Sequence, residues 1–145
     1  MYKHLLVPTD GSELSRFAVV HAAKFASALG ARVTLLNVQP EYPAPVFGEN
    51  LIEPFRRDFE LEYAKTSDAI LKDAAAEIER AGVACQHRVV ISSKPWEQII
   101  RMAEAEHCDL VFMASHGRSG VAGLLIGSET QKVITHCKIP VLVYR

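Results

Sequence analysis

The residues best suited to bind an anion lie in the segment Ala114-Ser115-His116-Gly117 and, after nine intervening residues, in Gly127-Ser128. This segment connects an apolar run to the predicted start of a helix. The N-terminus of a helix presents unpaired N–H groups and the positive end of the helix dipole, and glycines let the backbone approach an anion closely. Because Ser128 adds a hydroxyl donor, the pattern predicts a phosphate-binding loop.

The glycines of this loop do not follow the common nucleotide fingerprints. Gly117, Gly120, Gly123 and Gly127 fall within eleven residues, more than one turn requires, although the apolar stretch before Gly127 could also pack as a short helical turn. The dinucleotide pattern G-x-G-x-x-G and the P-loop lysine are both absent. Arg118 is the nearest cation in the sequence. The sequence therefore predicts that a bound triphosphate is neutralised by backbone N–H groups, by Arg118 and by Mg²⁺.

A second group of polar residues, Pro8-Thr9-Asp10-Gly11-Ser12, directly follows the first apolar run. The Asp10 carboxylate could accept hydrogen bonds from ribose hydroxyls, as acidic residues do in dinucleotide-binding folds. Alternatively, Asp10 or Ser12 caps the following helix, which alone would explain Asp-Gly-Ser. The residues leave both interpretations open.

His116 is the residue of these loops that suggests acid–base catalysis. No serine or cysteine nucleophile in a strained elbow accompanies it, so we expect a loop residue with a backbone partner and assign no catalytic residue. The six histidines and three cysteines lack metal-ligand and C-x-x-C spacing, which argues against a metal site and against a disulfide framework.

Short apolar runs predict the strands that position these loops. Five are found, at Leu5–Val7, Val33–Val38, Val89–Ile91, Leu110–Met113 and Val141–Tyr144. Unbroken apolar runs are typical of strands that are covered on both faces, as in a parallel sheet.

Helical patterns separate the apolar runs. They cover Leu14 to Leu29 with Gly30 as the stop, Leu61 to Ile78 ending near Gly82, a helix that opens at Pro95, and Ser128 to His136, where Ser128-x-x-Gln131 predicts a capping box. The alternation predicts one α/β domain over residues 1–145, a Rossmann-like, open five-stranded parallel sheet with helices on both faces. Ligands of such sheets bind at the carboxyl ends of the strands, so the loops after the first and fourth strands should form the site.

The connection from Gln39 to about Asp58 does not fit this compact pattern, because it contains four prolines among aromatic and charged residues. Connections of this length are usually functional or mobile. It could be a solvated surface excursion or a flap over the site.

Charge and hydropathy exclude several partners. The chain has 145 residues, is 49% hydrophobic and carries a net charge of −1 with no run of either sign, which gives no footprint for nucleic acid or for an anionic membrane. No segment approaches the ~20 apolar residues of a membrane span, and the N-terminal apolar run is too short for a signal peptide. We therefore expect a cytoplasmic protein without membrane insertion.

Four segments together resemble the universal stress protein family: Lys3–Ser12, Leu35–Val38, Asp109–Arg118 and Ile126–Val143. The resemblance extends over essentially the whole chain and implies an adenine nucleotide alpha hydrolase-like fold. The ATP-binding group of the family is marked by G-x2-G-x9-G-[ST]. Gly117, Gly127 and Ser128 match this motif, whereas Ala114 stands where the first glycine belongs.

The resemblance also implies roles for the residues of the two loops. Pro8, Thr9 and Asp10 would line the adenosine end, with Asp10 toward the ribose and Val38 offering backbone groups to adenine. The residues that would surround the phosphates are Gly117, Arg118, Gly127, Ser128, Glu129 and Thr130. Ala114 and His116 complete the predicted site.

The methyl group of Ala114 matters if the backbone there touches the ligand or has a positive φ, when it would cost roughly 1–2 kcal/mol, or about tenfold in affinity. Because Ala114 follows Met113 at a strand end, where φ is normally negative, we expect it to be tolerated.

Three functions remain open at this point. The first is a homodimeric, ATP-binding sensor or regulator in the stress response, which rests on Gly117, Gly127, Ser128 and Asp10 occurring together. It would pair through the apolar edge strand Val141–Tyr144. The second is a dimeric interaction or chaperone-like module whose glycine loop is structural. The third is slow nucleotide hydrolysis or transfer, as in the adenylating ATP-pyrophosphatases, although Thr9-Asp10-Gly11-Ser12 lacks their S-G-G-x-D-S loop.

Overall fold

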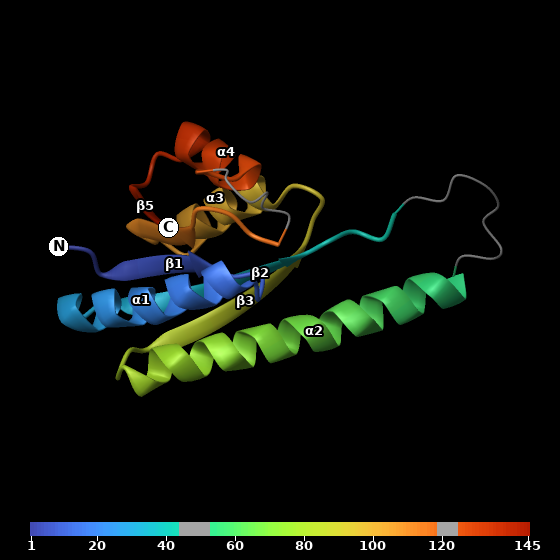
Figure 1. Ribbon diagram of the computed structural model, residues 1–145, viewed down its shortest axis with the longest axis horizontal. Helices are drawn as coiled ribbons and strands as arrows, with labels where there is room; N and C mark the ends of the chain where they lie inside the picture. Colours follow the sequence, from blue (N-terminus) through green and yellow to red (C-terminus); the bar gives the residue numbers. More distant parts are fainter. Residues whose placement is uncertain (44–52, 119–124) are drawn as a thin grey trace.

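A computed structural model describes residues 1–43, 53–118 and 125–145. Strands and helices alternate along these residues (Figure 1). In chain order they are β1 (His4–Pro8), α1 (Glu13–Leu29), β2 (Arg32–Gln39), α2 (Glu53–Arg80), β3 (Cys85–Ile91), α3 (Pro95–Ala105), β4 (Leu110–Ala114), α4 (Ser128–His136) and β5 (Val141–Tyr144).

The strands form one parallel sheet in the order β3-β2-β1-β4-β5. Helices α1 and α2 cover one face, and α3 and α4 cover the other (Figure 1). The predicted fold class is thereby confirmed. The chain leaves β1 toward β2 on one side and later returns to β4 on the other, so the topological switch point lies between β1 and β4.

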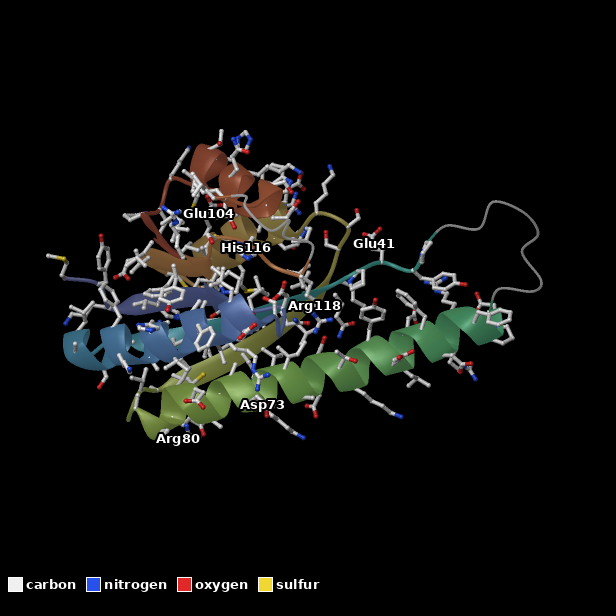
Figure 2. The ribbon with its side chains drawn as sticks, viewed as in Figure 1. Glu41, Asp73, Arg80, Glu104, His116 and Arg118 are labelled. Atoms are coloured by element: carbon white, nitrogen blue, oxygen red, sulfur yellow. The ribbon has the colours of Figure 1, made fainter. Side chains whose placement is uncertain are left out.

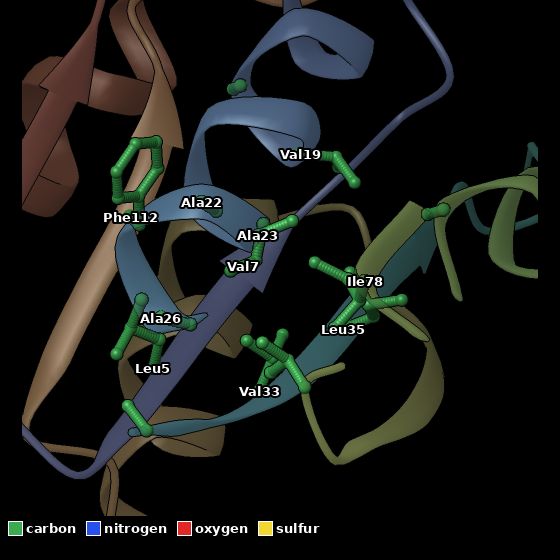
Figure 3. Close-up of a cluster of buried hydrophobic side chains, with 14 of the residues drawn as sticks. Leu5, Val7, Val19, Ala22, Ala23, Ala26, Val33, Leu35, Ile78 and Phe112 are labelled. Carbon is green, nitrogen blue, oxygen red and sulfur yellow. The ribbon is translucent and has the colours of Figure 1, made fainter. Parts of the chain in front are cut away.

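Strand alternation divides the core into two layers. On β1, Leu5 and Val7 pack with α1 and α2 (Figure 3), whereas Leu6 packs under α3 and α4. All three side chains are fully buried, a burial worth about 1.5–3 kcal/mol for each side chain. On β4, Phe112 joins the first layer and Met113 the second. The ends of β1 and β4 are therefore packed on both faces of the sheet.

The edge strands differ from the prediction of strands covered on both faces. Val89 and Ile91 of β3 are 45% and 57% exposed. These side chains are exposed because β3 is the edge strand of the sheet and α2 packs more extensively on β2 than on β3.

The structure confirms the predicted end of α1 at Gly30 and identifies Ser12, one of the two candidates, as its N-cap. The Ser12 hydroxyl accepts a hydrogen bond from Ser15 N at 3.3 Å and caps the helix, and Gly30 closes it with a left-handed backbone (φ 62°). Ser12 is thus the cap, and Asp10 is left for another role.

The capping box predicted at Ser128 is wrong. Gly127 is the N-cap of α4, its carbonyl accepts a hydrogen bond from Gln131 N at 2.9 Å, and Ser128 is already the first helical residue. The cause is the hydrogen bond from Gly127 N to Ser115 O (2.6 Å), which holds Gly127 in an extended conformation outside the helix.

The predicted connection from Gln39 to Asp58 is also shorter than expected. Gln39 ends β2, and α2 begins at Glu53 with Pro54 in its first turn, where a missing N–H costs little. The ring of Phe59 packs between those of Tyr42 (5.2 Å between centroids) and Tyr63 (4.5 Å), which anchors this part of the helix. Residues 44–52, on which the flap hypothesis depends, lie outside the described residues.

Candidate functional site

Asp10 joins the loop after β1 to the loop after β4. Its Oδ1 accepts a hydrogen bond from Ser12 N and its Oδ2 one from Arg118 N, each at 2.9 Å. Residues 10 and 118 are brought together because β1 and β4 are neighbours that both end at this edge of the sheet. Each carboxylate oxygen is thus held by a backbone N–H, one from each loop.

The Asp10 carboxyl is ionised at neutral pH. Burial by itself would raise its pKa, but hydrogen bonds from Ser12, Ser15 and the Arg118 N–H outweigh burial and hold the pKa below its usual range. The site therefore has a fixed negative charge at its β1 end, an acceptor for hydroxyl groups.

Two glycines of the β4 loop permit close backbone contacts. A Cβ on Gly117 would collide with Oδ2 of Asp10, so a side chain there would break the contact between the two loops. A Cβ on Gly127 would lie 3.1 Å from Cβ of His116 and 3.3 Å from Ser115 O. These glycines are required by their surroundings, since neither has a positive φ.

The N-terminus of α4 completes this side of the site. Gln131 N bonds to Gly127 O, whereas the N–H groups of Ser128, Glu129 and Thr130 have no acceptor among the described residues. The Thr130 hydroxyl donates to Ala114 O at 3.0 Å and ties the first turn of α4 to the end of β4. Unpaired N–H groups at the positive end of a helix dipole form a favourable binding position for an anion.

These elements enclose a cavity of about 460 Å³ at the carboxyl edge of the sheet. All the site residues predicted from the sequence line it: Pro8, Thr9, Asp10, Val38, Ala114, His116, Gly117, Arg118, Gly127, Ser128, Glu129 and Thr130. Sequence reasoning missed five further lining residues, which are Ser15, Leu36, Pro95, Ile99 and Met113. Strand alternation could have identified Leu36, because it lies two residues before Val38 on the same face of β2.

A buried polar chain supports the β1 loop from behind. Asn37 Nδ2 donates to Thr9 O at 2.9 Å, the Ser67 hydroxyl donates to Asn37 Oδ1, and Gln39 Nε2 donates to the Ser67 hydroxyl at 2.7 Å. These hydrogen bonds hold Thr9 in place through residues of β2 and α2. Because those residues are far from Thr9 in the sequence, local sequence patterns could not predict the contacts.

Among the described residues, the partner of the His116 ring is a side chain and not the backbone group expected from the sequence. Its Nδ1 lies 3.2 Å from the hydroxyl of Ser115. His116 and Arg118 are labelled in Figure 2.

No group of three potential metal-ligating side chains occurs within the described parts of the chain. The described charged residues of the cavity are Asp10, Glu129 and Arg118. The three cysteines are free, and burial raises the pKa of Cys85 to about 11 and of Cys108 to about 12, so these two are poor nucleophiles. In the described residues, no helix is long and apolar enough to cross a membrane.

Comparison with known proteins decides the family. The profile of the Universal stress protein family matches residues 1–145. The chain belongs to the universal stress protein family.

Similar members of the family span the full chain. A universal stress protein of Thermus aquaticus is 33% identical over 145 residues, with all of both chains covered. Universal stress protein MJ0577 of Methanocaldococcus jannaschii is 30% identical, with 100% of this chain and 96% of the relative covered. The solved structure of MJ0577 superposes with a TM-score of 0.86 at 31% identity, covering 99% and 96% of the two chains. A universal stress protein crystallised in complex with cAMP superposes with a TM-score of 0.70 at 27% identity, covering 99% and 97%.

Ala114, the altered motif position of this universal stress protein, lines the cavity, and its side chain packs in the core. Ala114 belongs to the core layer of Leu110 and Phe112 that packs against α1, while Met113 belongs to the opposite layer, on the side of the cavity. The backbone of Ala114 is extended, and its carbonyl is bonded to Thr130. A glycine is therefore not required there by space or by a positive φ.

Proposed function

We propose that this universal stress protein binds ATP in the cavity between the β1 and β4 loops and acts as a nucleotide-responsive regulator. The observation that carries the proposal is that Asp10, held by Arg118 N, lines the same cavity as the first residues of α4. A ribose and a phosphate chain need these two features at adjacent positions.

The cavity has a distinct environment for each part of the nucleotide. Leu36, Val38, Ile99 and Met113 supply an apolar wall for the base. Asp10 accepts from the ribose hydroxyls. The N–H groups of α4 and the Ser128 hydroxyl donate to the phosphates, with Arg118 as the cation. The volume of about 460 Å³ falls within the range of small-molecule sites.

We propose that ATP binds together with Mg²⁺. Asp10 and Glu129 are negative, so one arginine cannot neutralise a triphosphate in this cavity. Magnesium binds phosphate oxygens and retains several waters, and does not need a dedicated protein cage. The nucleotide itself would supply the ligands, consistent with a cavity that lacks a carboxylate cluster among the described residues.

The relative crystallised with cAMP supports an adenine nucleotide as the ligand class.

We further propose that the protein acts in the cytoplasm as a homodimer paired through β5. We also propose that its role is to bind nucleotide and not to hydrolyse it rapidly. Among its described residues the cavity has Arg118 as its arginine or lysine, so we expect any hydrolysis of ATP to be slow.

A Gly127→Val variant tests the proposal. The added side chain would crowd His116 and Ser115 O and displace the start of α4, so we expect ATP affinity in calorimetry to fall by at least about tenfold, while circular dichroism stays that of the folded protein.

Gly82→Ala is the matched control. Gly82 has a φ of 75° and open space around it, so this variant is destabilised by backbone strain but should bind ATP normally. If Gly127→Val binds ATP as the wild type does, the glycine loop is structural and the protein is better described as an interaction module.

A further inference from the structure

Helix α3 is capped by a side chain from another helix. The side chain of Lys94, at the N-cap position, does not cap a backbone N–H of the helix, and its Nζ lies 3.3 Å from Glu97 Oε1. Instead, Glu129 of α4 extends its Oε2 to Trp96 N, at 3.0 Å. A carboxylate at a helix N-terminus interacts favourably with the free N–H groups and with the helix dipole. Glu129 Oε1 also lies 3.4 Å from Lys132 Nζ, an exposed contact of little weight.

The contact with Trp96 N explains how the carboxylate of Glu129 can lie next to the proposed phosphate site. Glu129 follows Ser128 directly and lines the same cavity, where a free negative charge would repel a triphosphate. Directed at the N-terminus of α3, its charge is partly offset, and the N–H groups of the first turn of α4 stay available.

Helices α3 and α4 meet a second time at the other end of α4. The indole of Trp96 packs on the ring of His136, with 4.9 Å between ring centroids. Pro95, the neighbour of Trp96, lines the cavity. The first turn of α3 is therefore held by both the first and the last turn of α4.

We propose that Glu129 is a positioning residue that fixes the first turn of α4 against α3, so that binding of the phosphates is coupled to the environment of Trp96. The proposal rests on the proposed function. It differs from the role in contacting phosphates that the family resemblance implied for Glu129. Trp96, the single tryptophan of the chain, makes the coupling observable by fluorescence.

The test compares Glu129→Gln with Glu129→Ala, titrated with Mg-ATP and with adenosine by calorimetry and by Trp96 emission. Glutamine keeps an acceptor for Trp96 N and loses the charge, whereas alanine loses both. We expect Glu129→Ala to bind ATP about fivefold more weakly than Glu129→Gln, with adenosine affinity equal in the two variants. ATP should change Trp96 emission in the wild type and in Glu129→Gln, and less in Glu129→Ala.

Amide hydrogen exchange of Trp96 keeps this inference separate from ATP binding. Exchange should be faster in Glu129→Ala than in Glu129→Gln without any nucleotide. If the wild type binds no nucleotide but this difference in exchange is found, the cap stands and both the proposed function and the coupling fail. If the two variants share one ATP affinity, or exchange alike at Trp96, the positioning role is contradicted.

Discussion

At the scale of the residue, Ala114 illustrates how strand alternation decides the effect of one methyl group. The motif of the family places a glycine here, and the sequence alone could estimate only the cost of a steric conflict. The structure places Ala114 in the layer of Phe112, against α1, and Met113 in the layer that contains the cavity residues. The departure from the motif therefore adds a methyl group to the core layer on the α1 side, at a residue that also lines the cavity.

An Ala114→Gly variant follows from this placement. Since the methyl group lies in the core, restoring the motif glycine should leave the Mg-ATP dissociation constant within about twofold of the wild type. The free energy of unfolding should drop by about 1 kcal/mol, because glycine in a strand costs backbone entropy and removes a buried methyl. Calorimetry and urea unfolding measure the two quantities. An affinity gain of tenfold or more would show that the methyl obstructs the site.

The sequence predicted those site residues whose positions follow from local pattern. Asp10 and Gly117 come directly after apolar strands, and neighbouring parallel strands bring their ends together. The contacts that hold these residues could not be predicted, because they join positions far apart in the chain: Glu129 with Trp96 across 33 residues and Asn37 with Thr9 across 28. The capping box failed for the same reason, since a bond from Gly127 to Ser115 overrode the local motif.

At the scale of the element, a buried polar contact ties the first strands of the sheet together. His4 of β1 is 3% exposed, and its Nε2 lies 2.7 Å from the hydroxyl of Thr34 on β2. The same hydroxyl accepts a hydrogen bond from Gln86 Nε2 of β3 at 2.8 Å. Nδ1 of His4 is buried with no partner among the described residues, so a proton added there would be poorly solvated.

This contact predicts a dependence of stability on pH. Burial, assisted by the charge of Arg32, lowers the pKa of His4 below its ordinary value of 6.5. Below about pH 6.5 the unfolded chain binds a proton at His4 that the folded chain does not, so the contribution of His4 to stability is complete above pH 6.5 and is lost as the pH falls toward the folded pKa. Urea unfolding at several pH values should show this loss. A His4→Gln variant should have a shallower slope, and an unchanged slope would contradict the assignment.

At the scale of the whole molecule, β5 is the edge strand through which we propose that two copies of the protein pair. β5 has β4 as its neighbour, and its residues are half-buried. Val111 N bonds to Pro140 O and Ser115 N to Tyr144 O, so by the regular pattern of a parallel pair Val141 and Val143 turn their backbone groups to the open edge. Apolar side chains on such an edge favour pairing with a second copy.

A Val143→Pro variant tests the proposed dimer. Proline removes the outward N–H of β5 and leaves its bonds to β4 in place, which an edge strand tolerates. We expect light scattering to report a dimer for the wild type and a monomer for Val143→Pro. Val143→Thr, which keeps the N–H and the branched side chain, should remain dimeric. A wild-type monomer, or a Val143→Pro dimer of unchanged stability, would exclude pairing through β5.

The central claim is that the cavity between β1 and β4 binds ATP. Two readings on the purified wild-type protein make up the most direct measurement: the nucleotide released on denaturation, and the heat of binding when nucleotide-free protein is titrated with Mg-ATP. We predict released adenine nucleotide or a saturable heat of binding, with a stoichiometry of one per chain. Absence of both, with ligand raised to about 1 mM, where even weak binding of about −4 kcal/mol would be seen, would contradict the account.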